Sequence, residues 1–396
     1  MTSQTNTTEQ DASALVAARK EKLRRWREDL GVQPYGHRVD DLISLAEARS
    51  CFDATAHDAW SASQETGEAI DDPRPVVSVA GRCVQHRAMG KLVFMVLRDH
   101  SGDLQVSISK QDLEGTPFKL ASKLDYGDIV VARGPMGMTK KGEICVWANE
   151  FQVHCKSLSP PPEKFHGLTD QEARYRRRYV DMYANPETMG VFYARSRIVS
   201  CIRRCMEDAG FVEVETPMMQ PIAGGAAARP FSTHHNALDI ELFMRIAPEL
   251  YLKRLLVGGM PRVFELNRNF RNEGVDRRHN PEFTMLEAYQ AFGDYDAVLT
   301  LTESMLKSVA TELAEGGSMV RPYGEISIDW SKPFARQTYA ELVQQGAGVD
   351  MHDEAAVRAA ATSLGMEDAA TKDHWLLVEE LFEAKGESAI DPSQPT

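Results

Sequence analysis

The stretch that decides the fold runs from Arg262 to Gln290 and reads RVFELNRNFRNEGVDRRHNPEFTMLEAYQ. Its first part alternates with the side-chain period of a β-strand, which is two residues. One face of that strand carries Phe264, Leu266 and Phe270, and the other carries Glu265, Asn267, Asn269 and Arg271. After a charged loop at 273–279, a second strand begins near Pro281, with Phe283, Met285, Glu287 and Tyr289 on one face. We predict an antiparallel hairpin that gathers polar and aromatic groups on one surface.

The polar face of this hairpin needs a reason, because polar side chains on a central strand are costly unless they are paired or line a ligand cavity. An arginine can bridge an α-phosphate and a carboxylate, which brings the reacting groups together and neutralises both. An aromatic ring such as Phe283 can stack on adenine, and a carboxylate with a phenol can hold an ammonium group. The pattern suits ATP-driven activation of a cationic amino acid, and a structural ion-pair network inside the hairpin is the alternative.

Two segments that precede the hairpin add candidate site residues. Ala247-Pro248-Glu249 begins a helix, and Glu249 either complements the helix dipole or faces a ligand. Gly224-Gly225 exposes backbone that a small ligand can approach closely. His234 and His235 are neighbours on a strand and point to opposite faces, so they do not predict a metal site.

Further upstream, helix and strand patterns alternate with connectors. One helical face carries Ile198, Ile202, Cys205 and Ala209, and Gly210 ends that helix. The segment 211–217 alternates as a strand until Pro217 stops it. The proline-rich segment 157–163 is a stiff connector, and 53–75 is a linker or a poorly packed helix. Residues 1 to about 14 are predicted to be a disordered tail, followed by a basic helix over 15–30.

In residues 76–153 the pattern changes to short runs of alternating apolar and polar residues, separated by glycines. The candidate strands include Val77 and Val79, and the runs 92–97, 104–108, 129–131 and 144–147. Five short strands in this length predict a small closed barrel of the OB type, which commonly binds oligonucleotides. An SH3-like barrel fits the same pattern.

Composition places the chain among globular proteins with more than one domain. Its 396 residues are 43% hydrophobic and 26% charged, and no run is long and apolar enough to span a bilayer. The polar N-terminal segment lacks the features of a secretory signal. The six cysteines contain no C-x-x-C pair, so neither a disulfide framework nor a zinc site is indicated. We therefore expect the cytoplasm. Although the net charge is −13, the sequence contains basic clusters at 19–27 and 174–178. Each cluster is either solvated surface or an RNA contact.

Several long segments resemble one enzyme family. FVEVETPMMQ at 211–220 resembles motif 1 of the class II aminoacyl-tRNA synthetases, and FRNEG at 270–274 with RHNPEFTMLEAYQ at 278–290 resembles motif 2. HGLTD at 166–170, GGAAARPFSTHHNALD at 224–239 and RIAPELYLKRLLVGG at 245–259 resemble the lysyl-tRNA synthetases within that class. The resemblance implies an α+β fold: an N-terminal tail, basic helix and linker (1–75), an OB-fold anticodon-binding domain (76–156), and a class II catalytic domain with an antiparallel sheet and flanking helices (157–396).

The resemblance also implies the partners and the residue roles. The implied partners are ATP, L-lysine and tRNA(Lys). The chain is expected to form a homodimer through the motif 1 region around Pro217 and not to associate with a membrane. Lysine is bound by Gly225, Glu249, Arg271, Glu287 and Tyr289. ATP is bound by Arg271, Glu273, Arg278, His279, Asn280 and Phe283, and Arg271 is the catalytic residue because it contacts both substrates. Anticodon bases are read by Phe94, Gln105 and Glu143, although Phe94 suits the barrel core equally well.

Two departures from the family pattern stand out. Ala223 occupies the place where the family usually has proline before the glycine pair, and no motif 3 precedes Thr396. In the family, motif 3 supplies the carboxylates that bind Mg²⁺, so no metal ligand is assigned to this sequence. We expect an incomplete catalytic domain and an incomplete gene product.

Three other functions fit parts of this sequence. A paralogue that lysylates a translation factor resembles the catalytic domain alone, so the barrel argues against it. A lysine-activating domain for lipid modification conflicts with the lack of a transmembrane run. A non-catalytic RNA-binding or regulatory protein derived from a synthetase is favoured by the missing motif 3, whereas the retained Glu273, His279 and Phe283 oppose it.

Overall fold

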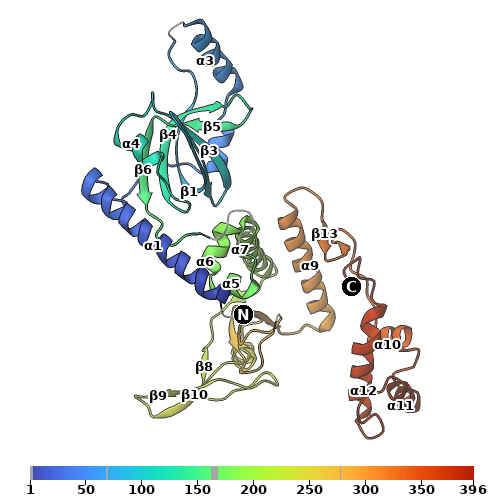
Figure 1. Cartoon of the computed structure of the whole chain (residues 1–396). Helices are drawn as coiled ribbons and strands as arrows, with labels where there is room; N and C mark the ends of the chain where they lie inside the picture. The colour runs from blue at the N-terminus through green and yellow to red at the C-terminus, as the bar shows by residue number, and fades with distance from the viewer. Residues whose placement is uncertain (1–2, 68–69, 162–167, 277) are drawn as a thin grey trace. The chain divides into compact units, whose positions relative to one another are not determined.

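The computed structural model describes residues 3–67, 70–161, 168–276 and 278–396 (Figure 1). His166 and Gly167 of the segment 166–170 lie outside these ranges, as do the last residues of the proline-rich connector. The chain divides into two compact units, Met1–Phe192 and Tyr193–Thr396. The domain boundary predicted at residues 156 and 157 stays a prediction.

The first unit is built on a closed β-barrel. Its strands are β1 (Val76–Met89), β2 (Leu92–Asp99), β3 (Gly102–Ser109), β4 (Ile129–Met138), β5 (Ile144–Trp147) and β6 (Glu150–Cys155). They pair in the order β1-β2-β3-β5-β4-β6, and β1 also pairs with β4 to close the barrel. The pairing of β3 with β5 is parallel, and the other pairings are antiparallel. The five predicted strands are present, and β6 was not expected because its EFQVHC sequence has few apolar residues.

Alternate residues of the barrel strands point inward and form one apolar core. On β2, Val93, Met95 and Leu97 are buried, whereas the residues between them are partly exposed. Three helices cover the core: α1 (Ser3–Leu30), α2 (Leu45–Ser50) and α4 (Thr116–Ala121). The helix predicted as one possibility for 53–75 is α3 (Ala54–Thr66), which Asp53 caps by accepting a bond from the Ala56 amide at 3.0 Å.

The prediction of a disordered tail is wrong from Ser3 onward, because α1 begins there and is continuous to Leu30. The segment 9–18, EQDASALVAA, is rich in residues of high helix propensity, and these extend the helix that the apolar stripe nucleates. The stripe itself docks on the barrel, since Trp26 is only 4% exposed and belongs to the barrel core.

The arginine cluster at 174–178 mainly organises short helices. The unit continues through α5 (Gln171–Arg176) and α6 (Arg178–Ala184) to the start of α7 (Pro186–Asp208). Asp181 is fully buried and accepts bonds from Arg174 Nε at 2.7 Å and from Arg178 Nη1 at 2.5 Å. Two of the clustered arginines are therefore engaged in holding this turn together.

The second unit is built around the predicted hairpin, β11 (Arg262–Phe270) and β12 (Glu282–Gln290), which pair antiparallel over their whole length. β7 (Val212–Glu213) pairs in parallel with β11, and it is shorter than the strand predicted for 211–217. A separate sheet contains β8 (Met219–Gln220), β10 (Ile240–Met244) and β9 (Ser232–His235). Helices α8 (Glu249–Val257) and α9 (Tyr295–Ala314) flank the hairpin in sequence.

Two apolar clusters support the second unit. The first joins Met206, Phe211 and Phe264 with partly buried residues that include Ile202 and Ala209, two of the four residues of the predicted apolar face. The second packs α10 (Tyr339–Ala347), α11 (Glu354–Ser363) and α12 (His374–Leu381), beyond the small hairpin of β13 (Val320–Tyr323) and β14 (Ile326–Asp329). Among the helices of the described ranges, none combines the length and the apolar character that crossing a membrane would require.

Candidate active site and nucleic-acid interface

The hairpin register brings the predicted polar and aromatic residues to one face. Glu265 lies directly opposite Glu287, and Asn269 lies directly opposite Phe283. Because residues directly opposite each other in an antiparallel pair share a face, the alternation read from the sequence is confirmed. Arg271 follows the end of β11, and its amide donates to the Pro281 carbonyl at 2.8 Å, which closes the mouth of the loop.

Four of the predicted lysine-binding residues gather where α8 meets the hairpin. Gly225 has a φ of +90°, and a Cβ added there would lie 3.0 Å from Glu249 Cβ. Glycine is therefore required both by the backbone conformation and by the close approach of α8. On β12, the Tyr289 hydroxyl donates to Glu287 Oε2 at 3.0 Å. The arrangement brings two carboxylates, a phenol and the backbone of Gly225 to one place.

The electrostatics of this cluster favour an ammonium ligand. Burial raises the pKa of Glu287, as does the negative charge of Glu249, and the bond from Tyr289 lowers it. Burial and the adjacent Glu287 carboxylate raise the pKa of the Tyr289 hydroxyl, which keeps it a hydrogen-bond donor. Glu249 accepts from Lys253 Nζ at 2.5 Å, and that ammonium lies 5.9 Å from the Tyr289 ring centroid. The site thus already accommodates one ammonium group at its edge.

Arg271 and Phe283 lie together at the loop end of the hairpin. The Arg271 guanidinium carbon is 5.3 Å from the Phe283 ring centroid. Arg271 Nε is buried without a hydrogen-bond partner among the described residues. A guanidinium packed on a ring has its remaining donors directed to the side, where they suit an anionic oxygen.

The loop after β11 presents the other predicted ATP-binding residues at the surface. Asp276 organises it by accepting from the amides of Arg278 and His279, both at 2.7 Å. The His279 side chain and these amides lower the pKa of Asp276 to about 2. Glu273 accepts from the Arg229 amide at 3.3 Å, and Asn280 Nδ2 donates to the Glu282 carbonyl at 2.7 Å. The side chains of Arg278 and His279 remain exposed.

A buried ion pair lies under the polar face, and sequence reasoning found only half of it. Arg245 Nη1 donates to Glu265 Oε1 at 2.6 Å, and Thr216 Oγ1 donates to Glu265 Oε2 at 2.6 Å. Glu265 was predicted to face this side, but Arg245 and Thr216 come from other segments. The signal for Arg245 was a charged residue inside the apolar run LFMRIA at 242–247.

The predicted anticodon-reading residues lie on the outside of the barrel. Phe94 is half-buried, points away from the inward-facing Val93 and Met95, and does not belong to the barrel core. Its strand neighbour on β3 is Ser107, and Gln105 Nε2 donates to Ser107 Oγ at 3.2 Å on the same face. Glu143 precedes β5, is exposed, and lies 3.4 Å from Arg49. Phe94 is partly exposed and lies on the face opposite the core, so the alternative that it belongs to the barrel core does not hold.

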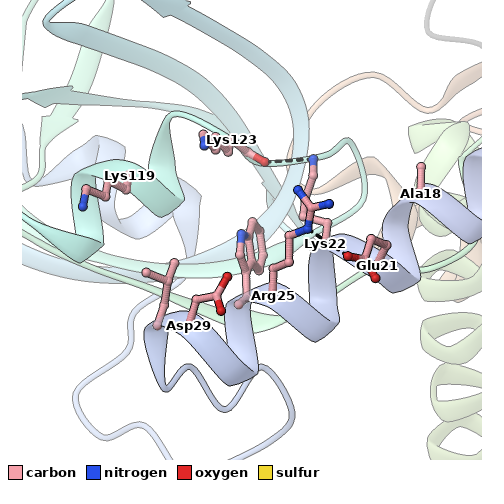
Figure 2. A pocket seen from close by; sticks show the side chains of 9 residues that line it. Ala18, Glu21, Lys22, Arg25, Asp29, Lys119 and Lys123 are labelled. Carbon is pink, nitrogen blue, oxygen red and sulfur yellow. Dashed lines mark hydrogen bonds and ion pairs between the residues drawn. The ribbon is translucent and has the colours of Figure 1, made fainter.

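A groove of about 620 Å³ separates α1 from α4, and Figure 2 shows that both helices contribute cations to it. Lys22 donates to the Lys123 carbonyl at 3.1 Å and to Asp125 at 2.6 Å. Arg25 pairs with Glu21 at 2.8 Å. The groove shares no residue with the face that carries Phe94, and these contacts explain part of the basic cluster at 19–27 as docking of α1 on the barrel.

Comparison with known proteins identifies the family. A family described as class II tRNA synthetases (D, K and N) matches residues 170–376, and an OB-fold nucleic acid binding domain matches residues 77–161. The lysine–tRNA ligase of Actinobacillus succinogenes is 45% identical over 402 residues, which cover 100% of this chain and 76% of that protein. The chain belongs to the lysine–tRNA ligases.

Other lysine–tRNA ligases agree with this assignment. Those of Syntrophomonas wolfei and Carboxydothermus hydrogenoformans are each 44% identical, over 98% and 90% of this chain and over 75% and 70% of their own lengths. The chain thus spans about three quarters of the length of the lysine–tRNA ligases it matches. Both the α+β class II fold and the OB-type barrel, rather than the SH3-like one, are confirmed.

Proposed function

We propose that this chain activates L-lysine with ATP and transfers the lysyl group to tRNA(Lys). The observation that carries the proposal is the single face of the hairpin on which Glu287 and Tyr289 lie at one end and Arg271 and Phe283 at the other. An acidic end suits the lysine ammonium groups, and a cationic, aromatic end suits a nucleotide. Membership of the lysine–tRNA ligases supports the same substrates.

In the first step a lysine carboxylate oxygen forms a bond to the α-phosphorus of ATP, and the bond to the pyrophosphate oxygen breaks. Pyrophosphate leaves with the bonding electrons and lysyl-adenylate remains. We assign to Arg271 the contact with both the carboxylate and the α-phosphate, where its charge stabilises the transition state. No general base is needed, because the attacking carboxylate is already ionised.

Residues around Arg271 are assigned to substrate binding. Gly225, Glu249 and Glu287 bind the lysine α-amino group, and Tyr289 helps to hold the ε-amino group. Phe283 stacks on adenine, with Glu273 and Asn280 at its polar edge. The exposed Arg278 and His279 reach the outer phosphates, and their backbone, fixed by Asp276, supports that role.

In the second step the terminal hydroxyl of tRNA attacks the lysyl carbonyl carbon, and AMP leaves. The barrel is assigned to the anticodon, with Phe94 stacking on a base and Gln105 and Glu143 forming hydrogen bonds to base edges. Phe94 and Gln105 both lie on the face of their strands that points away from the barrel core, which supports this assignment.

Mg²⁺ accompanies ATP in such reactions. Within the described ranges no three His, Cys, Asp or Glu side chains are grouped so as to hold a metal ion. We therefore assign no protein ligand to Mg²⁺.

We further propose a cytoplasmic homodimer that uses the motif 1 region. This region carries exposed apolar side chains: Val212 is 51%, Met219 58% and Ile222 67% exposed. Apolar side chains grouped on a surface are typical of protein interfaces.

Lysine-dependent exchange of pyrophosphate into ATP tests the activation step, with arginine and aspartate as control amino acids. We expect exchange with lysine alone. Binding of tRNA(Lys) without exchange would instead favour an RNA-binding derivative of a synthetase.

A further inference from the structure

A buried pair of opposite charges lies at the junction of three segments of the second unit. The side chain of Arg245 is 0% exposed and that of Glu265 is 1% exposed. Arg245 Nη1 donates to Glu265 at 2.6 Å and to Thr216 Oγ1 at 3.0 Å. Arg245 Nη2 is buried and has no hydrogen-bond partner within the described ranges.

Arg245 is bound to the edge of β11 through both its backbone and its side chain. The Phe270 amide donates to the Arg245 carbonyl at 3.0 Å, and Arg245 Nε donates to the Arg268 carbonyl at 2.9 Å. Two residues later, a Cβ built on Gly225 would lie 3.2 Å from Ala247 Cβ, and Glu249 follows at the start of α8. Arg245 therefore fixes the segment that carries Glu249 against the strand.

The partner of Arg245 fixes the other carboxylate. Glu265 lies directly across the hairpin from Glu287, and its two oxygens are held by Arg245 and Thr216. Asn267 Nδ2 adds a contact to Glu265 at 3.3 Å. One ion pair thus connects the positions of Glu249 and Glu287, although neither member belongs to the lysine-binding residues assigned above.

We propose that Arg245 and Glu265 are positioning residues for lysine, which hold Glu249 and Glu287 at the separation that an ammonium group between them requires. This inference rests on the proposed function. A displacement of about 1 Å in such a site can reduce its performance by about a hundredfold, so a residue that sets the spacing acts without touching substrate.

The pair also balances the charge around Glu287. The groups that face this carboxylate are Tyr289 beside it on β12, Glu249 on α8 with its partner Lys253, and the Arg245–Glu265 pair. Burial raises the pKa of Glu287, and Glu249 and Glu265 raise it further, whereas Tyr289 and Arg245 lower it. Neutralising Arg245 should therefore raise the pKa of Glu287, and neutralising Glu265 should lower it.

The test compares Arg245→Met, Glu265→Gln and the double variant R245M/E265Q in the full chain. Dissociation constants for lysine and for ATP are measured by titration calorimetry between about pH 5.5 and pH 8.5, and folding is checked by thermal unfolding. The double variant leaves no unpaired buried charge, so it is expected to fold even where Arg245→Met does not. A matched control is the buried pair of the barrel, altered as K156M/D128N.

We expect the double variant to bind lysine about tenfold or more weakly and to bind ATP within about twofold of the unaltered chain. Lysine binding of Glu265→Gln should persist to lower pH, and that of Arg245→Met should be lost at higher pH, because the two changes shift Glu287 in opposite directions. The barrel control should lower the unfolding temperature and leave lysine binding unchanged.

Unaltered lysine binding by the folded double variant would overturn the positioning role and leave a structural ion pair. Equal losses for lysine and ATP would overturn it too, since they would indicate a general disturbance of the hairpin. Failure of the unaltered chain to bind lysine would be a different result, because it would overturn the proposed function on which the inference rests.

Discussion

The two units each contain a buried ion pair, and the pairs differ in how completely they are satisfied. In the barrel, Lys156 Nζ donates to Asp125 at 2.7 Å, to Asp128 at 2.7 Å and to the Ser157 carbonyl at 3.3 Å. Asp128 also accepts from the amides of Asp125 and Ser157, each at 2.9 Å. In the hairpin unit, Arg245 Nη2 is buried and has no partner among the residues that the structure describes.

The difference follows from what surrounds each pair. Lys156 directly follows β6, and its hydrogen bonds connect this segment to the turn before β4, next to Trp26. The partners of Lys156 named above all belong to the barrel unit. In the hairpin unit, the Arg245–Glu265 pair lies close to two further carboxylates, those of Glu249 and Glu287. A saturated internal pair is tied only to the fold around it, whereas the Arg245–Glu265 pair lies beside Glu287, which has a hydrogen bond from Tyr289 and no cation paired with it among the described residues.

The largest effect is expected from breaking the saturated pair. Lys156→Met leaves Asp128 buried without its cation, and should lower the free energy of unfolding by about 3 to 5 kcal/mol. Chemical denaturation of the full chain measures this, with the exposed Lys91→Met as the control. A loss no larger than that of the control would mean that the Lys156 network does not stabilise the barrel.

The next effect concerns the lysine end of the hairpin. Glu287→Gln keeps the bond to Tyr289 but removes the charge, and should weaken lysine binding by about 2 to 3 kcal/mol while ATP binding changes little. Calorimetry with each ligand separates the two. Equal losses for both ligands would contradict the role assigned to Glu287.

A smaller effect is expected on the outside of the barrel. Phe94→Ala removes one stacking surface and should weaken tRNA(Lys) binding by about 1 to 3 kcal/mol without changing lysine-dependent exchange. A filter-binding titration measures it. Val76→Ala, an exposed apolar residue on β1, serves as the control, and an identical loss there would argue against a specific stacking role.

The smallest effect is a pH dependence. The pKa of Glu287 is raised from its ordinary 4.5, and the ionised form is the one that attracts an ammonium group. While the amino groups of lysine remain charged, its affinity should be full above this raised pKa, where Glu287 is ionised, and should fall as the pH decreases through it. A profile that coincides with that of the Glu287→Gln variant at every pH would show that the charge of Glu287 does not contribute to lysine binding.

Much of the hairpin could be predicted because its information is local. The alternation from Arg262 to Arg271 decides which side chains share a face, whatever the rest of the fold does. The barrel strands followed from the same rule, and β6 was missed because its polar residues resemble a loop. The start of α1 was misplaced because composition alone separates a polar helix poorly from a disordered tail.

The sequence by itself determined the family, the two faces of the hairpin and the residue types at the site, because these depend on order and periodicity. Only the tertiary structure decided that Thr216, Arg245 and Glu265 meet, that Gly225 contacts Glu249, and that Phe94 points away from the barrel core. Contacts between distant segments depend on strand register and on how elements pack, and neither is encoded in any short stretch of the chain.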